Sequence, residues 1–300
     1  MVIRMEAGIH HFPEPPSSGG ETGGSDGHDT APTANWGTAL RGTRFGPFEM
    51  VGTTGSTNDD LVARAAGHAD DGLVLATDHQ SAGRGRLDRR WEAPEGTNLT
   101  FSTLLRPDWL AEPAPGPDRR GLVTSALAVS VVEVLMALGL DAVVKWPNDV
   151  MLAGTHAGKV AGILAELVTG KRPAIVVGLG LNVAWPPLET AVSDEPVPPG
   201  ATSLARAGLQ AYRWRVMVDV LIAFDRQLAD LDRPDGPERL RQNHLAVSAT
   251  VANRVRLEQS GGGLIGEAVD LTTDGALVVQ PDEGEVIKVH AGDVTHMREG

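Results

Sequence analysis

Residues 159–183 read KVAGILAELVTGKRPAIVVGLGLNV and contain two strand-like runs joined by the spacer TGKR. The run before them, AVVKWPNDVML (142–152), is separated from residue 159 by the spacer AGTHAG. Both spacers are short enough to close hairpins, and a hairpin pairs its two strands in antiparallel fashion. We therefore expect much of the sheet to be antiparallel.

Further strands and helices flank this stretch. GLVLAT (72–77) and TNLTFSTLL (97–105) are β-rich runs bounded by turn residues, and they predict two more strands. Residues 124–138 have helical length and are almost wholly apolar, which predicts a buried helix. Residues 212–231 have the period of an amphipathic helix, and residues 236–247 suggest another. The fold class that follows is α+β, with a mixed, largely antiparallel sheet and helices.

The two ends of the chain differ in composition from its middle. Residues 1–43 form a low-complexity tail of mostly Pro, Gly, Ser, Thr and acidic residues, and we expect disorder because such a segment buries too little apolar surface. Residues 249–300 alternate short strands with the turns SGGG, TDG, DEG and AGD, which is typical of a small, barrel-like all-β domain. Residues 44–248 are then the main domain.

The composition excludes several classes of protein. The 300-residue chain carries a formal net charge of −13, which argues against a general nucleic-acid binder with a basic face. It has no cysteine, so disulfides and thiolate metal sites are excluded. No apolar run approaches the roughly 20 residues that span a bilayer, and the first residues lack a secretory signal. We therefore expect a cytoplasmic protein without DNA or membrane partners.

Three glycine-rich segments approach known nucleotide-binding patterns without matching them. GTHAGKV (154–160) lacks both the first glycine and the hydroxyl residue of a P-loop. GLGLNV (178–183) and GRGRLD (83–88) lack the third glycine of a dinucleotide fingerprint. Ser56, in TGSTN, lacks the G-x-S-x-G elbow of a hydrolase nucleophile. None of these common sites is predicted.

A basic loop, SAGRGRLDRRW (81–91), places four arginines in this acidic chain. Arginine forks match carboxylates and phosphates, and glycines let the backbone close tightly over a ligand. Trp91 can stack on a purine or cover an apolar ligand. We expect the guanidinium groups to repel one another until an anion arrives. The alternative is a solvated hairpin loop.

Two lysines and a polar pair are further candidates. Lys145 and Lys159 lie in apolar strand contexts, where a lysine either extends to solvent or is held for chemistry. Asn148 and Asp149 follow a stiff Trp-Pro pair, which either aims the carboxylate from a strand or forms an ordinary turn. Taken alone, these residues leave both alternatives open.

Five motifs, in one order, carry a family resemblance: GSTN (55–58), Gln80 with the basic loop, KWPNDV (145–150), GKVAGILAE (158–166) and VGLGLNV (177–183). Together they resemble the catalytic domain of biotin–protein ligases over about residues 45–248, and the C-terminal domain resembles that family's SH3-like barrel. The resemblance implies a class II synthetase-like catalytic domain and a two-step reaction. ATP activates biotin to biotinyl-5′-AMP, and a lysine of a biotin carboxyl carrier protein domain of an acyl-CoA carboxylase then takes the biotin.

The resemblance also implies three groups of site residues. The catalytic group is Lys159, Asp149 and Arg86: Lys159 contacts the biotin carboxyl and the α-phosphate, and Asp149 assists Mg²⁺ or the incoming lysine. Biotin or biotinyl-AMP is bound by Ser56, Thr57, Asn58, Gln80, Gly83, Arg84, Gly85, Arg86, Lys159 and Gly162. The nucleotide is bound by Arg89, Trp91, Lys145, Asn148 and Asn182. ATP and biotin are then substrates, and Mg²⁺ accompanies the phosphates.

Other functions stay open beside this one. A lipoate-type ligase of the same fold forms the same kind of adenylate, although the GRGRxxRxW pattern favours biotin. A biotin-binding sensor without catalysis is a second alternative. The low-complexity tail leaves no room for the N-terminal helix-turn-helix domain of some family members, so we expect a ligase without a DNA-binding role. We expect a monomer or a weak homodimer.

Overall fold

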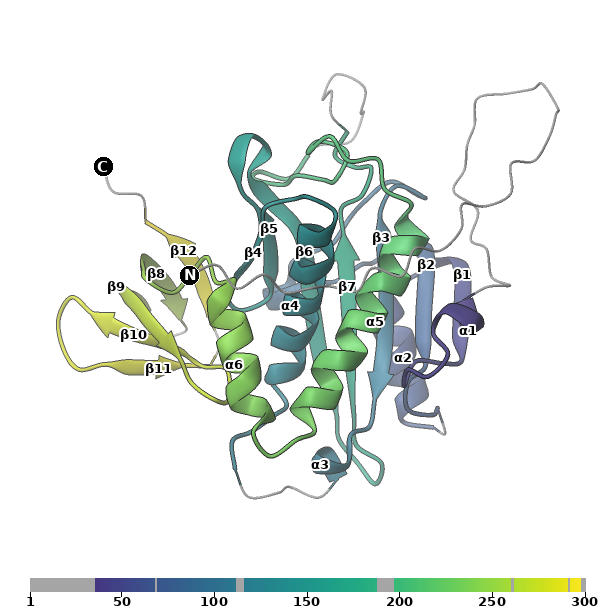
Figure 1. The fold of residues 1–300 in the computed structure, drawn as a ribbon, viewed down its shortest axis with the longest axis horizontal. Coiled ribbons are helices and arrows are strands. Elements are labelled where there is room, and N and C mark those ends of the chain that lie inside the picture. Colours follow the sequence, from purple (N-terminus) through teal and green to yellow (C-terminus); the bar gives the residue numbers. More distant parts are fainter. Residues whose placement is uncertain are drawn as a thin grey trace.

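A computed structural model of the chain describes residues 36–67, 69–111, 116–187, 197–259, 262–290 and 292–297. Residues 1–35 lie outside the described residues, so the predicted disorder of that segment stays a prediction. The described chain forms a large domain with a central sheet and a small all-β domain beside it (Figure 1).

A seven-stranded sheet forms the centre of the large domain, in the strand order β1-β2-β3-β7-β6-β5-β4. The β1–β2 pair is parallel, and the other neighbouring pairs are antiparallel. The predicted α+β class with a largely antiparallel sheet is therefore confirmed. The strands are β1 (Phe48–Thr54), β2 (Val74–Gln80), β3 (Leu99–Leu105), β4 (Ala142–Lys145), β5 (Asp149–Leu152), β6 (Gly158–Val168) and β7 (Ala174–Leu181).

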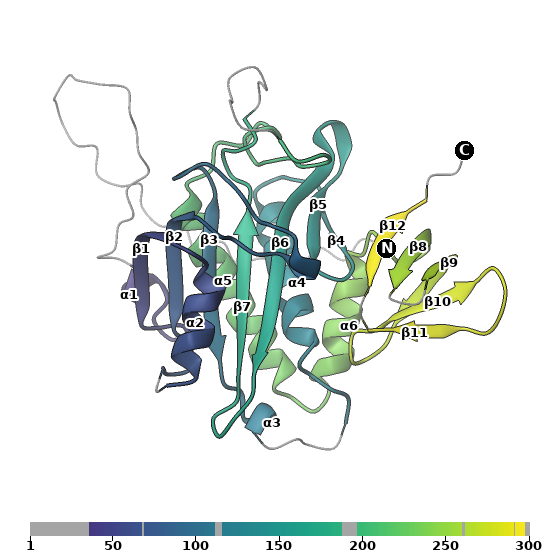
Figure 2. The same ribbon diagram turned by 180° about the vertical axis from the view of Figure 1, so that it is seen from behind.

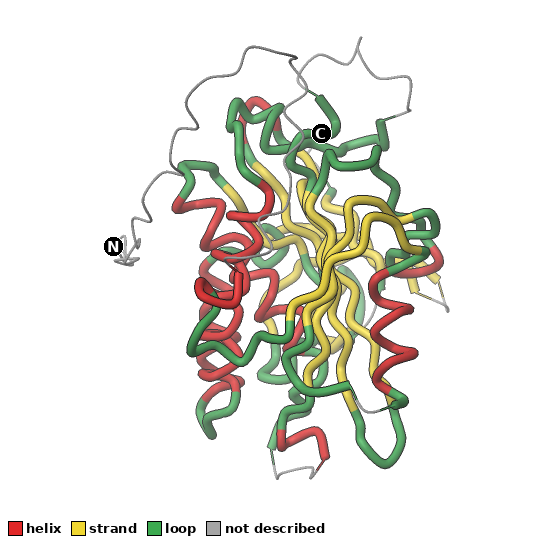
Figure 3. Tube along the Cα trace, turned by 90° about the vertical axis from the view of Figure 1, so that its right-hand side faces the viewer, coloured by secondary structure: helices red, strands yellow, loops and turns green. Residues whose placement is uncertain are grey.

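Helices cover both faces of this sheet. Helices α4, α5 and α6 lie on one face (Figure 1), and α2 lies on the other, so the sheet is the middle of three layers (Figures 2 and 3). Helix α4 is apolar on nearly all sides because it is enclosed by the sheet, α5 and α6. The helices are α1 (Trp36–Ala39), α2 (Thr57–Ala65), α3 (Asp108–Ala111), α4 (Leu122–Ala137), α5 (Arg213–Leu231) and α6 (Gly236–Ala246).

The C-terminal domain is a five-stranded antiparallel sheet in the order β11-β10-β9-β8-β12. Its strands are β8 (Asn253–Gln259), β9 (Gly262–Leu271), β10 (Leu277–Pro281), β11 (Ile287–Val289) and β12 (Asp293–His296). The linker to it runs along β4: the backbone N of Val144 donates to Val247 O, and the backbone N of Ala249 donates to Val144 O, each at 2.8 Å. The prediction of a small all-β domain is confirmed.

The run AVVKWPNDVML, predicted as one strand, is a hairpin. Strands β4 and β5 pair antiparallel across a turn at 146–148, with Lys145 opposite Asp149. A proline has no N–H to give to a strand ladder, so the chain turns at Pro147 instead of continuing. The turn brings both ends of the KWPND motif together.

The predicted tail of residues 1–43 extends too far. Trp36, in α1, is only 4% exposed, and its ring lies 4.1 Å from Phe48 and 5.5 Å from Trp214 between centroids. Leu40 is buried in the same core. Residues 36–43 therefore belong to the large domain, because burying these apolar side chains offsets the cost of ordering the segment.

Candidate active site

The GSTN motif forms the start of helix α2. Ser56 is the N-cap residue, and its Oγ accepts a hydrogen bond from the backbone N of Asp59 at 3.4 Å. Thr57 donates its backbone N–H to Oε1 of Gln80, at the end of β2, at 2.8 Å. The cap and the glutamine each satisfy a donor that the first helical turn leaves unpaired. These contacts fix the helix start against the sheet.

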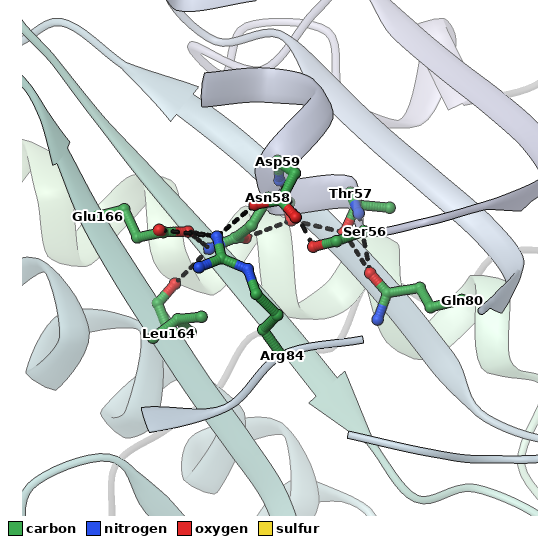
Figure 4. Close-up of polar contacts among 9 residues, drawn as sticks. Ser56, Thr57, Asn58, Asp59, Gln80, Arg84, Leu164 and Glu166 are labelled. Carbon is green, nitrogen blue, oxygen red and sulfur yellow. Dashed lines mark hydrogen bonds and ion pairs between the residues drawn. The ribbon is translucent and has the colours of Figure 1, made fainter. Parts of the chain in front are cut away.

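A chain of polar side chains crosses the sheet from this helix (Figure 4). Thr57 Oγ1 lies 2.7 Å from Ser102 Oγ, and Ser102 donates to Oδ1 of Asn58 at 2.6 Å. Nδ2 of Asn58 donates to Glu166 Oε2 at 2.8 Å and to Leu164 O at 3.2 Å. Because both ends of the Asn58 amide are held, its orientation is fixed. The site thus has a rigid set of polar groups before any ligand binds.

Glycines on β6 and β7 make the floor of the site. A Cβ at Gly178 would lie 2.2 Å from Oδ1 of Asn58, and a Cβ at Gly180 would lie 2.3 Å from Cε2 of Trp91. Gly162 pairs with Gly180, and its Cβ would lie 3.1 Å from the same indole. Alternate residues of a strand face the same side. The GLGL sequence therefore clears the space in which Asn58 and Trp91 lie.

The basic loop is folded back on itself. The backbone N of Trp91 donates to Gly83 O at 2.9 Å, and that of Gly85 donates to Arg89 O at 2.7 Å. Between them lies the short 3-10 turn η1 (Arg86–Asp88), in which Leu87 and Asp88 both have φ of +56°. Leu87 is 65% exposed. The loop forms a flap over the glycine floor.

The guanidinium group of Arg84 is paired with carboxylates of the protein itself. Its Nη2 lies 2.7 Å from both Glu166 oxygens and also forms an ion pair with Asp59 (Figure 4). The hydrogen bond to Glu166 raises the pKa of Arg84 against the opposing effect of burial. We expected the guanidinium groups to repel one another until an anion arrives; at Arg84 the protein itself supplies the anions, the carboxylates of Glu166 and Asp59.

The β4–β5 turn contributes the other end of the site. Nζ of Lys159 lies 2.6 Å from Oδ1 of Asp149, and it stands 5.7 Å from the ring centroid of Trp91. Asn148 accepts a hydrogen bond from Arg86 Nη1 at 3.2 Å and donates to Ile163 O at 2.9 Å. Lys159 is thus held for the site rather than extended to solvent, and Asn148 connects the loop to β6.

These residues surround one cavity, and most of the predicted site residues line it. The C-terminal domain adds Gly292 to the wall. The wall contains six basic side chains, those of Arg84, Arg86, Arg89, Arg90, Lys145 and Lys159, and one carboxylate, that of Asp149. The predicted residues in the wall are Ser56, Thr57, Asn58, Gln80, Arg84, Gly85, Arg86, Arg89, Trp91, Lys145, Asn148, Asp149, Lys159 and Gly162.

Two predicted residues lie outside the cavity wall. Gly83 supports the loop, as the acceptor for the backbone N of Trp91. Asn182 is 4% exposed; its Nδ2 donates to Thr202 O at 2.9 Å, and its Oδ1 accepts from Asn98 at 3.0 Å. Asn182 is therefore buried among protein groups and does not line the ligand cavity.

Several site residues were not predicted. Ser102 and Glu166 complete the polar chain, and Gly178 and Gly180 form the floor. The GLGL sequence held a readable signal, because glycines at alternate strand positions mark a close approach to one face. Ser102 offered none, since a serine inside an apolar strand is common.

Within the described ranges, no group of three or more His, Cys, Asp or Glu side chains is arranged to hold a metal ion. None of the helices in this described part of the chain is both long and apolar enough to cross a bilayer.

Comparison with known proteins gives the family. Residues 54–182 match the Biotin/lipoate A/B protein ligase family, and residues 253–297 match the Biotin protein ligase C terminal domain. The chain is 37% identical over 270 residues to the biotin–[acetyl-CoA-carboxylase] ligase of Mycobacterium tuberculosis, which covers 86% of this chain and 91% of that protein. The chain belongs to the biotin protein ligase family.

A second biotin–[acetyl-CoA-carboxylase] ligase, from Paracoccus denitrificans, is 33% identical to this chain over 251 residues. The alignment covers 79% of this chain and 96% of that protein. Among solved structures, the biotin protein ligase from Aquifex aeolicus in complex with biotin and ATP has a TM-score of 0.66 and 24% identity. That alignment covers 85% of this chain and 100% of the other. The biotin protein ligase fold thus extends over both domains.

Proposed function

We propose that this protein joins biotin to ATP, giving biotinyl-5′-AMP and pyrophosphate, and then transfers biotin to a lysine of a biotin carboxyl carrier domain. In the first step a biotin carboxylate oxygen forms a bond to the α-phosphorus, and the bond to the pyrophosphate oxygen breaks. In the second step a neutral lysine amine attacks the acyl carbon, and AMP leaves with its phosphate oxygen. The proton lost by the amine passes to a base or to solvent.

One observation carries this proposal: the cavity combines a fixed polar end with a cationic end. The hydroxyl and amide groups of Thr57, Asn58 and Gln80 offer the few oriented donors and acceptors that a ureido ring needs. The cationic end suits the carboxylate of biotin and the phosphates of ATP, because arginine and lysine side chains bind both kinds of anion. Six basic side chains thus gather around one cavity in a chain of net charge −13, as the binding of an anionic ligand requires.

Lys159 and Arg86 suit the first step. Negative charge accumulates on the phosphoryl oxygens and on the leaving pyrophosphate, and cations already aimed at these positions stabilise the transition state. Lys159 must exchange its contact with Asp149, at 2.6 Å, for the ligand. That exchange would leave the Asp149 carboxylate available to the incoming amine in the second step.

Mg²⁺ fits this site only as a companion of the nucleotide. Among the described residues that line the cavity, Asp149 is the one with a carboxylate, and Mg²⁺ is commonly held by one or two carboxylates together with substrate phosphates. Such an ion would neutralise phosphate charge next to Asp149.

Pyrophosphate release separates the candidate substrates and the candidate functions. We expect release with ATP and biotin, and little or none when lipoate replaces biotin. Release with lipoate but not biotin would assign the chain to the lipoate-type branch. Biotin binding without any release would make it a sensor. Transfer is then measured by blotting biotin on a purified carrier domain, with a carrier whose acceptor lysine is replaced by arginine as the control.

A further inference from the structure

Trp146 belongs to the catalytic motif by sequence and to the C-terminal domain by packing. It is 3% exposed, and the apolar residues around it are those of the C-terminal core, such as Val255, Leu277 and Val294. Trp146 and its neighbours in the chain, Lys145 and Pro147, also border the ligand cavity. One side chain of the β4–β5 turn is thus inserted into another domain.

Two hydrogen bonds fix the position of this residue. The backbone N of Trp146 donates to Thr250 Oγ1 at 3.0 Å, and its indole Nε1 donates to Gly275 O at 3.0 Å. Thr250 is fully buried, and its hydroxyl also lies 3.2 Å from Nε2 of His296 on β12. Both ends of the tryptophan are therefore held by the C-terminal domain or by the segment that enters it.

The turn that Trp146 anchors carries much of the phosphate end of the site. Asn148 positions Arg86, and Asp149 holds Lys159. Lys145 lines the cavity and lies close enough to His296 to lower the pKa of that imidazole, although burial contributes more to the shift. A displacement of the turn moves several of these groups together.

The polar end of the cavity has a different support. Thr57 and Asn58 are held by Gln80, Ser102 and Glu166, which lie on β2, β3 and β6. None of the hydrogen bonds described for these side chains reaches the C-terminal domain. Contacts to biotin and contacts to the nucleotide thus depend on different parts of the molecule.

We propose that Trp146 is a positioning residue, through which the C-terminal domain holds the Lys145–Asp149 turn in the geometry that adenylation needs. The inference rests on the proposed function. It assigns to Thr250 the role of fixing the turn, by accepting the backbone N–H of Trp146. Removing that acceptor leaves a buried N–H without a partner, and the turn relaxes to satisfy it.

The test compares Thr250→Val with Thr250→Ser. We expect the valine variant to lower kcat/KM for ATP in biotin-dependent pyrophosphate release between about fivefold and a hundredfold, the range that an unsatisfied buried donor produces. The Kd of biotin should stay within twofold, and the serine variant should restore activity. Trp146→Phe, which loses only the bond to Gly275, should shift the same parameter in the same direction and provides the test if Thr250→Val does not fold.

Thr103→Val is the matched control. Thr103 is also fully buried, on β3, and its hydroxyl has no hydrogen-bond partner among the described residues. The same chemical change there should leave kcat/KM unaltered. A purely structural role for Thr250 would lower the melting temperature but leave the kinetics of the folded enzyme unmoved, and that result would overturn the proposal. An equal loss of biotin affinity would overturn it as well.

Failure of the proposed function has a different signature, because wild-type protein would then release no pyrophosphate. Hydrogen exchange at residues 145–149 tests the anchoring without activity: it should quicken in Thr250→Val and not in Thr103→Val. If the exchange rate at residues 145–149 is the same in both variants, the inference is refuted, whether or not the wild-type protein releases pyrophosphate.

Discussion

Gly180→Ala should displace Trp91 from the floor of the site and weaken ligand binding. The new Cβ would lie 2.3 Å from Cε2 and 2.5 Å from Nε1 of the indole. Unbonded carbon atoms normally stay about 3.5–4.0 Å apart, so the ring must move by more than about 1 Å. The backbone N of Trp91 is bonded to Gly83 O at 2.9 Å, which keeps the main chain in place. The ring therefore rotates toward solvent.

The magnitude follows from this overlap. Overpacking of this kind costs roughly 1–3 kcal/mol, and each 1.4 kcal/mol is a tenfold change in affinity, so binding should weaken by about fivefold to a hundredfold. At Gly162 the nearest atoms, of Trp91 and Lys159, would stand 3.1–3.2 Å from a new Cβ. These atoms have to yield by only a few tenths of an ångström, so Gly162→Ala should cost less than about threefold.

Calorimetric titration with biotin, and then with ATP in the presence of biotin, measures both effects. Gly52→Ala, on β1, is the neutral control, because a Cβ there meets no atom within 4 Å. Melting temperatures show whether each variant is folded. Equal affinities in Gly180→Ala and wild type, with both proteins folded, would refute the placement of Trp91 on the glycine floor.

Three further predictions concern catalysis and stability. Lys159→Ala should slow pyrophosphate release about a hundredfold to a thousandfold, because losing such electrostatic stabilisation costs roughly 3–4 kcal/mol; a single-turnover rate within threefold of wild type would exclude the assigned role. Burial lowers the pKa of His244 from 6.5 to about 4, so the unfolded chain takes up the proton first, and the free energy of unfolding should fall by up to about 3 kcal/mol as the pH drops from about 6.5 to 4. Urea titrations should show this slope in wild type and a flatter one in His244→Gln; parallel curves would contradict it. Trp36→Ala should cost roughly 3–5 kcal/mol of unfolding free energy, and an unchanged urea midpoint would show that α1 is not part of the core.

Elements with a strong hydrophobic pattern were predictable from the sequence. Strands β6 and β7 and helices α4 and α5 bury long apolar runs or stripes, which leave a clear period in the sequence. Strand β1 and helix α2, near the start of the large domain, were not predicted. Strand β1 is a half-exposed edge strand, and α2 has few apolar residues because its first turn serves the site.

The site was predictable as a list of residues but not as a set of contacts. Family motifs named most of the cavity wall, including Lys159 and Asp149. They did not reveal that these two side chains pair with each other, because Asp149 lies on β5 and Lys159 on β6, and their contact depends on the register of that strand pair, which shifts between Val150 and Met151. They also did not reveal Glu166 as the partner of Arg84, since that contact joins residues 82 positions apart.

Chloride and free phosphate compete for any cluster of cations in solution. In this protein Arg84 is paired with Glu166 at 2.7 Å, and Lys159 is paired with Asp149 at 2.6 Å. Both carboxylates are attached to the same chain as the cations that they contact. A tethered group has a high effective concentration, so a small anion that offers a single contact displaces it poorly. Biotin and ATP bound side by side would offer a carboxylate and phosphates together. These groups could replace the carboxylates of Glu166 and Asp149 at the same time. We therefore expect the carboxylates of Glu166 and Asp149 to weaken the competition of small anions for Arg84 and Lys159, so that inorganic phosphate should be a weak inhibitor.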